Sequence, residues 1–238
     1  MPRDVSPVTE LPNHISRQFN RELGGIYSKV LDMGGLVEDH LTTVMDALAN
    51  DDAEPAEYVA VSDHKVNDLE LEIDQDCTEI LLRRQPAAGD LRLVLSVSRT
   101  TMDLERIGDE VKKVGRIATK LIADDMPEAH YLGIVTVGHR GARLLRGALD
   151  AFARTDSGAA INIVTEGRRV DHESDAVMRQ LITLMMEDPR CISRALEVVM
   201  AMRSLQRVSD HANNICENLI YLVEGRDVRH RSIFDDAP

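Results

Sequence analysis

Pairs of acidic residues four positions apart recur along this chain of 238 residues. Residues with this separation lie on one face of an α-helix, so each pair presents its carboxylates side by side. Carboxylates from two neighbouring helices are suitable ligands for a hard or borderline cation, so the pairs predict candidate metal sites. The complete pairs are Glu70 and Asp74, Glu105 and Asp109, and Asp171 and Asp175. A fourth, incomplete pair ends at Asp210, with Gln206 in place of the first acid.

A simpler interpretation of the same acids is a solvated helix surface. Glu105 and Asp109 lie more than about 100° from the middle of the apolar sector formed within residues 104–114, so they point sideways or outward. Asp109 also precedes Lys113 by four positions, which predicts an ion pair of about 0.3–0.5 kcal/mol. Both interpretations stay open at this stage, but recurrence at related places in the two halves favours the metal sites.

Other chemistry has little support in the sequence, and we expect no enzyme activity. The chain lacks Glu-x-x-His, HExxH, paired CxxC, P-loop and GxSxG motifs. His172 and His211 each follow an acid, but adjacent helical residues diverge by about 100°, so we expect both at the solvated surface. The 3 cysteines are widely spaced, which favours small apolar roles in a reducing compartment over disulfides.

Composition narrows the fold class and the class of partner. Hydrophobic residues make up 43% of the chain and aromatic residues only 3%, so the core is built from aliphatic side chains that favour helices. A net charge of −13 disfavours nucleic acid as a partner. We find no apolar run of membrane-spanning length and no signal-peptide pattern, which predicts a cytoplasmic protein.

Helical periodicity extends through the chain between clusters of turn-forming residues. Breaks are predicted at residues 50–55, 85–90, 123–128, 155–158 and 187–190, and Gly225 ends the last helix. The six segments between them carry apolar residues at steps of three, four and seven, and none alternates with the period of a strand. In the first segment, Gly34 and Gly35 weaken the helix by about 1 kcal/mol each, which predicts close approach of a neighbouring helix.

A repeated phrase indicates that the six helices form two equivalent sets. Residues 103–110 read DLERIGDE, and residues 204–211, 101 positions later, read SLQRVSDH. We therefore predict an all-α protein made of two tandem three-helix bundles of long antiparallel helices. Their predicted bounds are residues 1–123 and 124–225, followed by a C-terminal tail at 226–238. Two core arrangements stay open: a separate core in each bundle, or one interface shared between them.

Several of these motifs resemble those of one known family. QPAAGDLR at 85–92, DLERIGDE at 103–110, RVSDHANNICE at 207–217 and MGGLVE at 33–38 are similar to the PhoU family of bacterial phosphate-uptake regulators. The resemblance extends over nearly the whole chain and involves both halves.

Membership in the PhoU family implies a fold, a function and partners. The implied fold is two similar three-helix bundles, without enzyme activity. The implied function is negative regulation when phosphate is plentiful, by coupling the phosphate ABC transporter to a sensor histidine kinase. The implied contacts are the ATPase subunit of the transporter, the kinase and a second copy in a homodimer, so the chain associates with the membrane peripherally, through its partners.

The resemblance also implies metal at the surface acids. Some PhoU proteins bind multinuclear iron or zinc through E(D)xxxD motifs, which the pairs at Glu70, Glu105 and Asp171 match. At Asp210 the usual acidic partner is replaced by Gln206, so we expect weaker metal binding at this second site. Two alternatives remain: a carboxylate-bridged metal-binding or metalloenzyme bundle, and a helical adaptor without any ligand.

Overall fold

The computed structural model describes residues 17–62, 64–124 and 131–228. Within these ranges every regular element is a helix, as the periodicity predicts, and none is a strand. The elements are α1 (Arg17–Ala49), α2 (Ala53–Val61), α3 (His64–Arg84), α4 (Ala88–Ala123), α5 (Leu132–Arg154), α6 (Ser157–Glu187), the 3-10 turn η2 (Pro189–Cys191) and α7 (Ile192–Glu224). The predicted domain boundary at 123/124 adjoins residues 125–130, which lie outside the described ranges, as do residues 229–238 of the predicted tail.

The turn-forming residues end and begin helices by identifiable contacts. Asp156 caps α6, because its side chain accepts a hydrogen bond from the backbone N–H of Ala159 at 2.9 Å. Asp188 accepts in the same way from the N–H of Arg190 at 3.1 Å, between α6 and α7. Gly225 follows α7 with a left-handed φ of 69°, the position that favours glycine past a helix end. These three predicted breaks are confirmed.

The second predicted segment differs from the sequence expectation, because it is divided into α2 and α3. The hydroxyl of Ser62 donates to the carbonyl of Tyr58 at 2.6 Å, and the Ser62 N–H donates to Val59, so the helix ends there. Val59 and Val66 stay buried on either side of the break, so the seven-residue apolar spacing continues across it. Spacing alone therefore did not reveal that the helix is interrupted.

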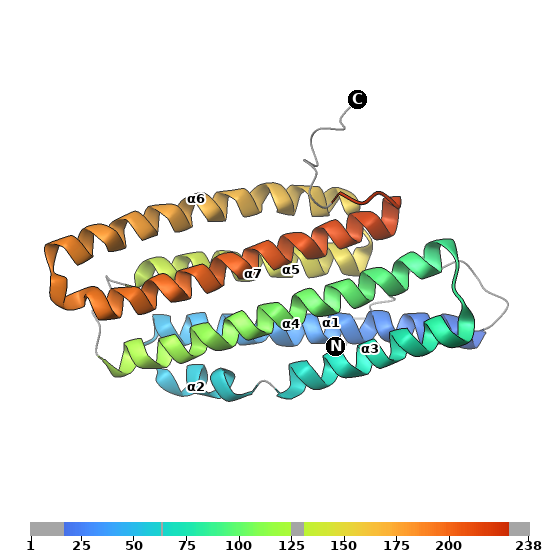
Figure 1. The fold of residues 1–238 in the computed structure, drawn as a ribbon, viewed down its shortest axis with the longest axis horizontal. Helices are drawn as coiled ribbons and strands as arrows, with labels where there is room; N and C mark the ends of the chain where they lie inside the picture. Colours follow the sequence, from blue (N-terminus) through green and yellow to red (C-terminus); the bar gives the residue numbers. More distant parts are fainter. Residues whose placement is uncertain (1–16, 63, 125–130, 229–238) are drawn as a thin grey trace, which may run out of the picture.

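The helices form two groups that lie against each other along their lengths (Figure 1). The first group holds α1 to α4, with α2 and α3 end to end, and the second holds α5, α6 and α7. Between the groups, α4 packs on α7 and α1 packs on α5. Buried apolar side chains form one continuous cluster through both groups, so the halves share an interface. None of the helices in the described ranges combines the length and the apolar composition that a membrane span requires.

Glycines bring α1 and α5 close together, as the sequence predicted for the first helix. A Cβ atom at Gly34 would lie 2.4 Å from a terminal carbon of Leu149, and one at Gly138 would lie 1.8 Å from the sulfur of Met45. Gly35 makes no such approach. Each glycine therefore receives a large side chain from the opposite helix, which is the reciprocal pattern of a two-fold interface.

Candidate functional site

The first predicted carboxylate cluster lies where α3 meets α4. Glu70 of α3 and Asp109 of α4 are both half-buried, and Asp74 is exposed one turn after Glu70. Burial raises the pKa of Glu70, and the negative charges of Asp74 and Asp109 raise it further. Glu105 is also half-buried on α4, one turn before Asp109. The structure thus places Glu70, Asp74 and Asp109 close enough for their charges to interact. They lie at the side of the bundle rather than in its core.

The side chains of this cluster are not placed to coordinate a metal ion as they stand. Within the ranges that the structure describes, no group of three or more His, Cys, Asp or Glu side chains is positioned to hold a metal ion. The side-chain hydroxyl of Ser98 donates to Asp74 at 3.4 Å, which turns one carboxylate oxygen toward α4. A cation at this place would require the acids to converge further, although their mutual repulsion is the kind that a cation relieves.

The second predicted cluster has less support. Asp175 on α6 and Asp210 on α7 are both exposed, and the side chain of Asp171 lies outside the described ones. Gln206 is half-buried on α7. The second cluster thus has more exposed acids than the first, and it stays a prediction.

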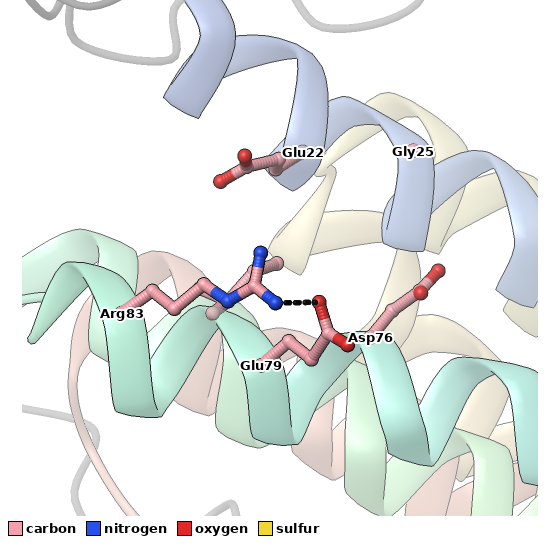
Figure 2. A pocket seen from close by; sticks show the side chains of 6 residues that line it. Glu22, Gly25, Asp76, Glu79 and Arg83 are labelled. Atoms are coloured by element: carbon pink, nitrogen blue, oxygen red, sulfur yellow. Dashed lines mark ion pairs between the residues drawn. The ribbon is translucent and has the colours of Figure 1, made fainter.

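A hollow of about 160 Å³ between α1 and α3 contains other acids (Figure 2). Its carboxylates already have cationic partners. Glu22 accepts two hydrogen bonds from Arg84, at 2.7 and 2.8 Å, and Asp76 lies 2.9 Å from the ammonium of Lys29. Glu79 pairs with Arg83 of the same helix, as Figure 2 shows. Because these charges are matched, the hollow is best described as an ion-paired junction between the two helices.

The seam between α4 and α7 holds a polar network that the sequence analysis missed. Asp103 is buried, and one of its carboxylate oxygens lies 2.9 Å from Nδ1 of His211 and 3.0 Å from the amide nitrogen of Asn214. Its other oxygen accepts from the amide of Asn218 at 3.2 Å. The expectation that His211 is a solvated surface residue was wrong, because the ring turns toward this buried acid; His172 is exposed as predicted.

A second buried acid lies two turns further along the same seam. Glu110 pairs with Arg207 of α7 at 2.9 Å and with Lys113 of α4 at 3.0 Å, and it also accepts a hydrogen bond from Ser204. Burial acts to raise the pKa of Glu110, but these three donors outweigh it and hold that pKa below its usual range. Lys113 therefore pairs with Glu110, where the sequence analysis placed Asp109 as its partner.

The two buried acids occupy corresponding places in the repeat. A shift of 101 positions converts Asp103 into Ser204, and the same shift converts Glu110 into His211. The contact of Asp103 with His211 and the contact of Glu110 with Ser204 are therefore two copies of one interhelical contact. In the first contact the acid is Asp103, and in the second it is Glu110, seven residues later on α4.

One signal in the sequence could have revealed the seam. His211, Asn214 and Asn218 follow each other at helical steps of three and four, so they form a polar stripe on one face of α7. The stripe adjoins the apolar stripe of the same helix, and a polar stripe beside a core needs a partner such as Asp103 on the facing helix. The acids spaced by four, by contrast, lie on other helix faces and do not reveal this seam.

Burial makes two of the cysteines, Cys77 and Cys216, poor nucleophiles. All 3 are free, as the sequence predicted. Burial raises the pKa of Cys77 and of Cys216 to about 12, so their thiols stay protonated at neutral pH and are poor nucleophiles.

Comparisons with known proteins agree with the repeated architecture. The family model described as the PhoU domain matches twice, at residues 30–118 and 134–219. A phosphate-specific transport system accessory protein PhoU homolog of Pseudomonas aeruginosa is 46% identical over 220 residues, which cover 92% of this chain and 91% of that protein.

Solved structures give the same result. The crystal structure of PhoU from Pseudomonas aeruginosa has a TM-score of 0.84 at 45% identity, and covers 88% of this chain and 100% of its own. The phosphate transport system regulatory protein PhoU from Streptococcus pneumoniae has a TM-score of 0.80 at 29% identity, with 89% and 99% covered. From the double match and this similarity along nearly its whole length, the chain belongs to the PhoU family.

Proposed function

We propose that this protein regulates phosphate transport, as an accessory protein that keeps the phosphate-starvation response off when phosphate is plentiful. The observation that carries the proposal is similarity to phosphate-transport accessory proteins through both repeats, with the helices in the same arrangement as in a solved PhoU. The seam between the repeats is consistent with it, because buried polar contacts join α4 to α7 while long helix faces stay exposed. Such a body is suited to binding other proteins rather than to catalysis.

The proposed partners are the ATPase subunit of a phosphate ABC transporter and a phosphate sensor histidine kinase. The proposed place of action is the cytoplasmic side of the membrane, with a homodimer as the active form. A net charge of −13 favours partners with basic surfaces. The alternative of a carboxylate-bridged metalloenzyme bundle gains no support from the similar proteins, which are named as transport accessory proteins.

The surface acids are proposed as a site of metal-dependent docking, with iron or zinc as the cation. Bound metal would reverse the local charge near Glu70 and Asp109, and so change which partner surface the bundle attracts. Binding of the ATPase subunit, measured with and without a chelator, tests this part alone. Equal affinity in both conditions removes the metal from the mechanism and leaves the regulatory proposal intact.

Phosphatase expression in a deletion strain tests the regulatory function. Without this gene, cells grown with ample phosphate are expected to express alkaline phosphatase constitutively, and a plasmid copy is expected to restore repression. The empty plasmid is the matched control and is expected to leave expression constitutive. Repression that persists in the deletion strain would contradict the proposed function.

A further inference from the structure

An arginine pair lines a hollow of about 370 Å³ on the α4–α7 seam, away from the acid pairs spaced by four. Arg99 and Arg106 are seven residues apart on α4, so both side chains leave the same face of the helix, about 10 Å apart along its axis. Asn214 and Asn218 of α7 form the facing wall. Most of the lining side chains are charged or carry an amide, so the hollow is suited to a polar ligand.

The repeat accounts for the missing anionic partner of Arg106 among the described residues. Its counterpart 101 positions later, Arg207, pairs with the buried Glu110 at 2.9 Å. The position that corresponds to Glu110 is His211, which is not an acid and which faces Asp103. Among the described residues, no carboxylate lies within ion-pair distance of Arg106, which stays exposed at the edge of the hollow.

One guanidinium nitrogen of Arg99 also lacks an acceptor among the described residues. Its guanidinium lies over the ring of Tyr221, 5.0 Å from the ring centre, which holds its plane in place. Its Nη1 atom is buried and, within the described part of the chain, makes no hydrogen bond. A buried donor without an acceptor is unfavourable, so a ligand oxygen that reaches it recovers that loss.

The amides of the facing wall are already oriented as donors. Asn214 and Asn218 each direct one N–H of the amide toward Asp103. The amide nitrogen of Asn214 also lies 3.5 Å from Nδ1 of His211, so the second N–H of Asn218 is the one left for a ligand. Asp103 accepts from both amides and lies beside His211, and together with Glu217 it also lines the hollow. The hollow therefore presents two guanidinium groups and two amides, beside the carboxylates of Asp103 and Glu217.

We infer that this hollow is a binding site for a small tetrahedral oxyanion, held between Arg99 and Arg106. Guanidinium groups bind such anions through paired N–H donors, and here they are placed on one rigid helix. The carboxylates of Asp103 and Glu217, which also line the hollow, balance the formal charge, so we expect affinity in the millimolar range. The inference rests on the geometry of the seam and is independent of the proposed regulatory function.

The test is ³¹P NMR of inorganic phosphate titrated with the full chain, in which binding broadens the phosphate signal. Arg106→Gln is expected to weaken binding at least about tenfold, because one charge-assisted contact is removed. Arg116→Gln is the matched control, since Arg116 is an exposed arginine of α4 outside the hollow. It removes the same charge from the same helix and is expected to change affinity by less than about twofold.

Competition decides whether the site recognises an oxyanion or only negative charge. Sulfate is expected to displace phosphate, and chloride at matched ionic strength is expected to leave the broadening unchanged. Circular dichroism must show equal melting of both variants, as exposed positions allow. The proposal is overturned if the wild-type chain gives no saturable broadening, if both arginine variants lose binding equally, or if chloride competes as well as sulfate.

Discussion

Leu149 of α5 packs directly onto Gly34 of α1, and the two residues belong to different repeats. The reciprocal contact, of Met45 on Gly138, is related to the first by a shift of 104 positions, which converts Gly34 into Gly138 and Met45 into Leu149. Two copies of one contact across an interface indicate that the repeats face each other about an approximate two-fold axis. The halves thus associate as two subunits of a dimer do, within a single chain.

Alanine at Gly34 is expected to destabilise the fold, because its Cβ atom would lie 2.4 Å from a terminal carbon of Leu149. Overpacking of this kind costs about 1–3 kcal/mol, which exceeds the gain of about 1 kcal/mol from replacing a helical glycine. Gly35→Ala is the control, since a Cβ atom there meets nothing within 4 Å, and it is expected to stabilise. Urea unfolding of the two variants measures the difference. A gain in stability for both would show that the interface is loose at Gly34.

The fold could be predicted from sequence because its signals are local and repeated. The seven-residue spacing of Leu23, Val30, Val37 and Val44 specifies a buried helix face, and all four are buried. The break at Ser62 could not be predicted in this way, because it depends on hydrogen bonds within a segment whose apolar spacing continues unchanged.

The candidate sites were harder to predict, because they depend on which helices face each other. Spacing by four placed Glu105 and Asp109 on one helix face, but it gave no information on the distance to α3. The buried roles of Asp103 and Glu110 arise only when α4 meets α7, so neither acid differs from a surface acid in the sequence alone. An alignment of the two repeats pairs the positions of Asp103 and Ser204. It does not show which residues of the facing helix contact them.

Replacing Glu110 by glutamine is expected to reduce stability in a pH-dependent manner. The pKa of Glu110 is held below its usual value of 4.5 in the folded state, so its charge stabilises the fold above that value. The benefit decreases as pH falls through the lower folded pKa. We expect the variant to lose about 1–3 kcal/mol at pH 7, because Arg207 and Lys113 lose a charged acceptor, and to lose less near pH 3.

Unfolding free energies at the two pH values measure this change. Glu197→Gln is the control, because Glu197 of α7 also pairs with a lysine of α4, Lys120, at 3.1 Å, but Glu197 is only half-buried and Lys120 is exposed. Its loss is expected to stay below about 1 kcal/mol at pH 7. Equal losses for the two variants would mean that burial of Glu110 contributes nothing.

Glu70→Gln is expected to raise stability slightly at neutral pH. The pKa of Glu70 is raised by burial and by the charges of Asp74 and Asp109, so its charged form is disfavoured in the folded state. This penalty is present above the folded pKa and disappears as pH falls below the unfolded value near 4.5. Melting temperatures at pH 7 and pH 4 are expected to differ from wild type only at pH 7. A lower melting temperature at pH 7 contradicts this account.

The same variant tests metal binding at the first cluster. A cation that binds only the folded chain raises the melting temperature with concentration, so added zinc is expected to stabilise wild type. Glu70→Gln is expected to lose most of this stabilisation, since it removes a charged ligand. Asp175→Asn on α6 is the comparison, and it is expected to keep the effect because the second cluster is the weaker site. Absence of any zinc effect on wild type, with metal-free protein confirmed by elemental analysis, would exclude the site.

The contact between Asp103 and His211 is expected to couple α4 to α7 energetically. Asp103→Asn removes a charged acceptor and places an amide opposite other donors, so we expect a loss of about 1–3 kcal/mol. In a double-mutant cycle with His211→Ala, the coupling is expected to reach at least about 0.5 kcal/mol. A parallel cycle with His172→Ala, an exposed histidine of α6, is the control and is expected to be additive within about 0.5 kcal/mol. If the first cycle is equally additive, His211 lies beside the acid without stabilising it, and the seam is maintained by the amides alone.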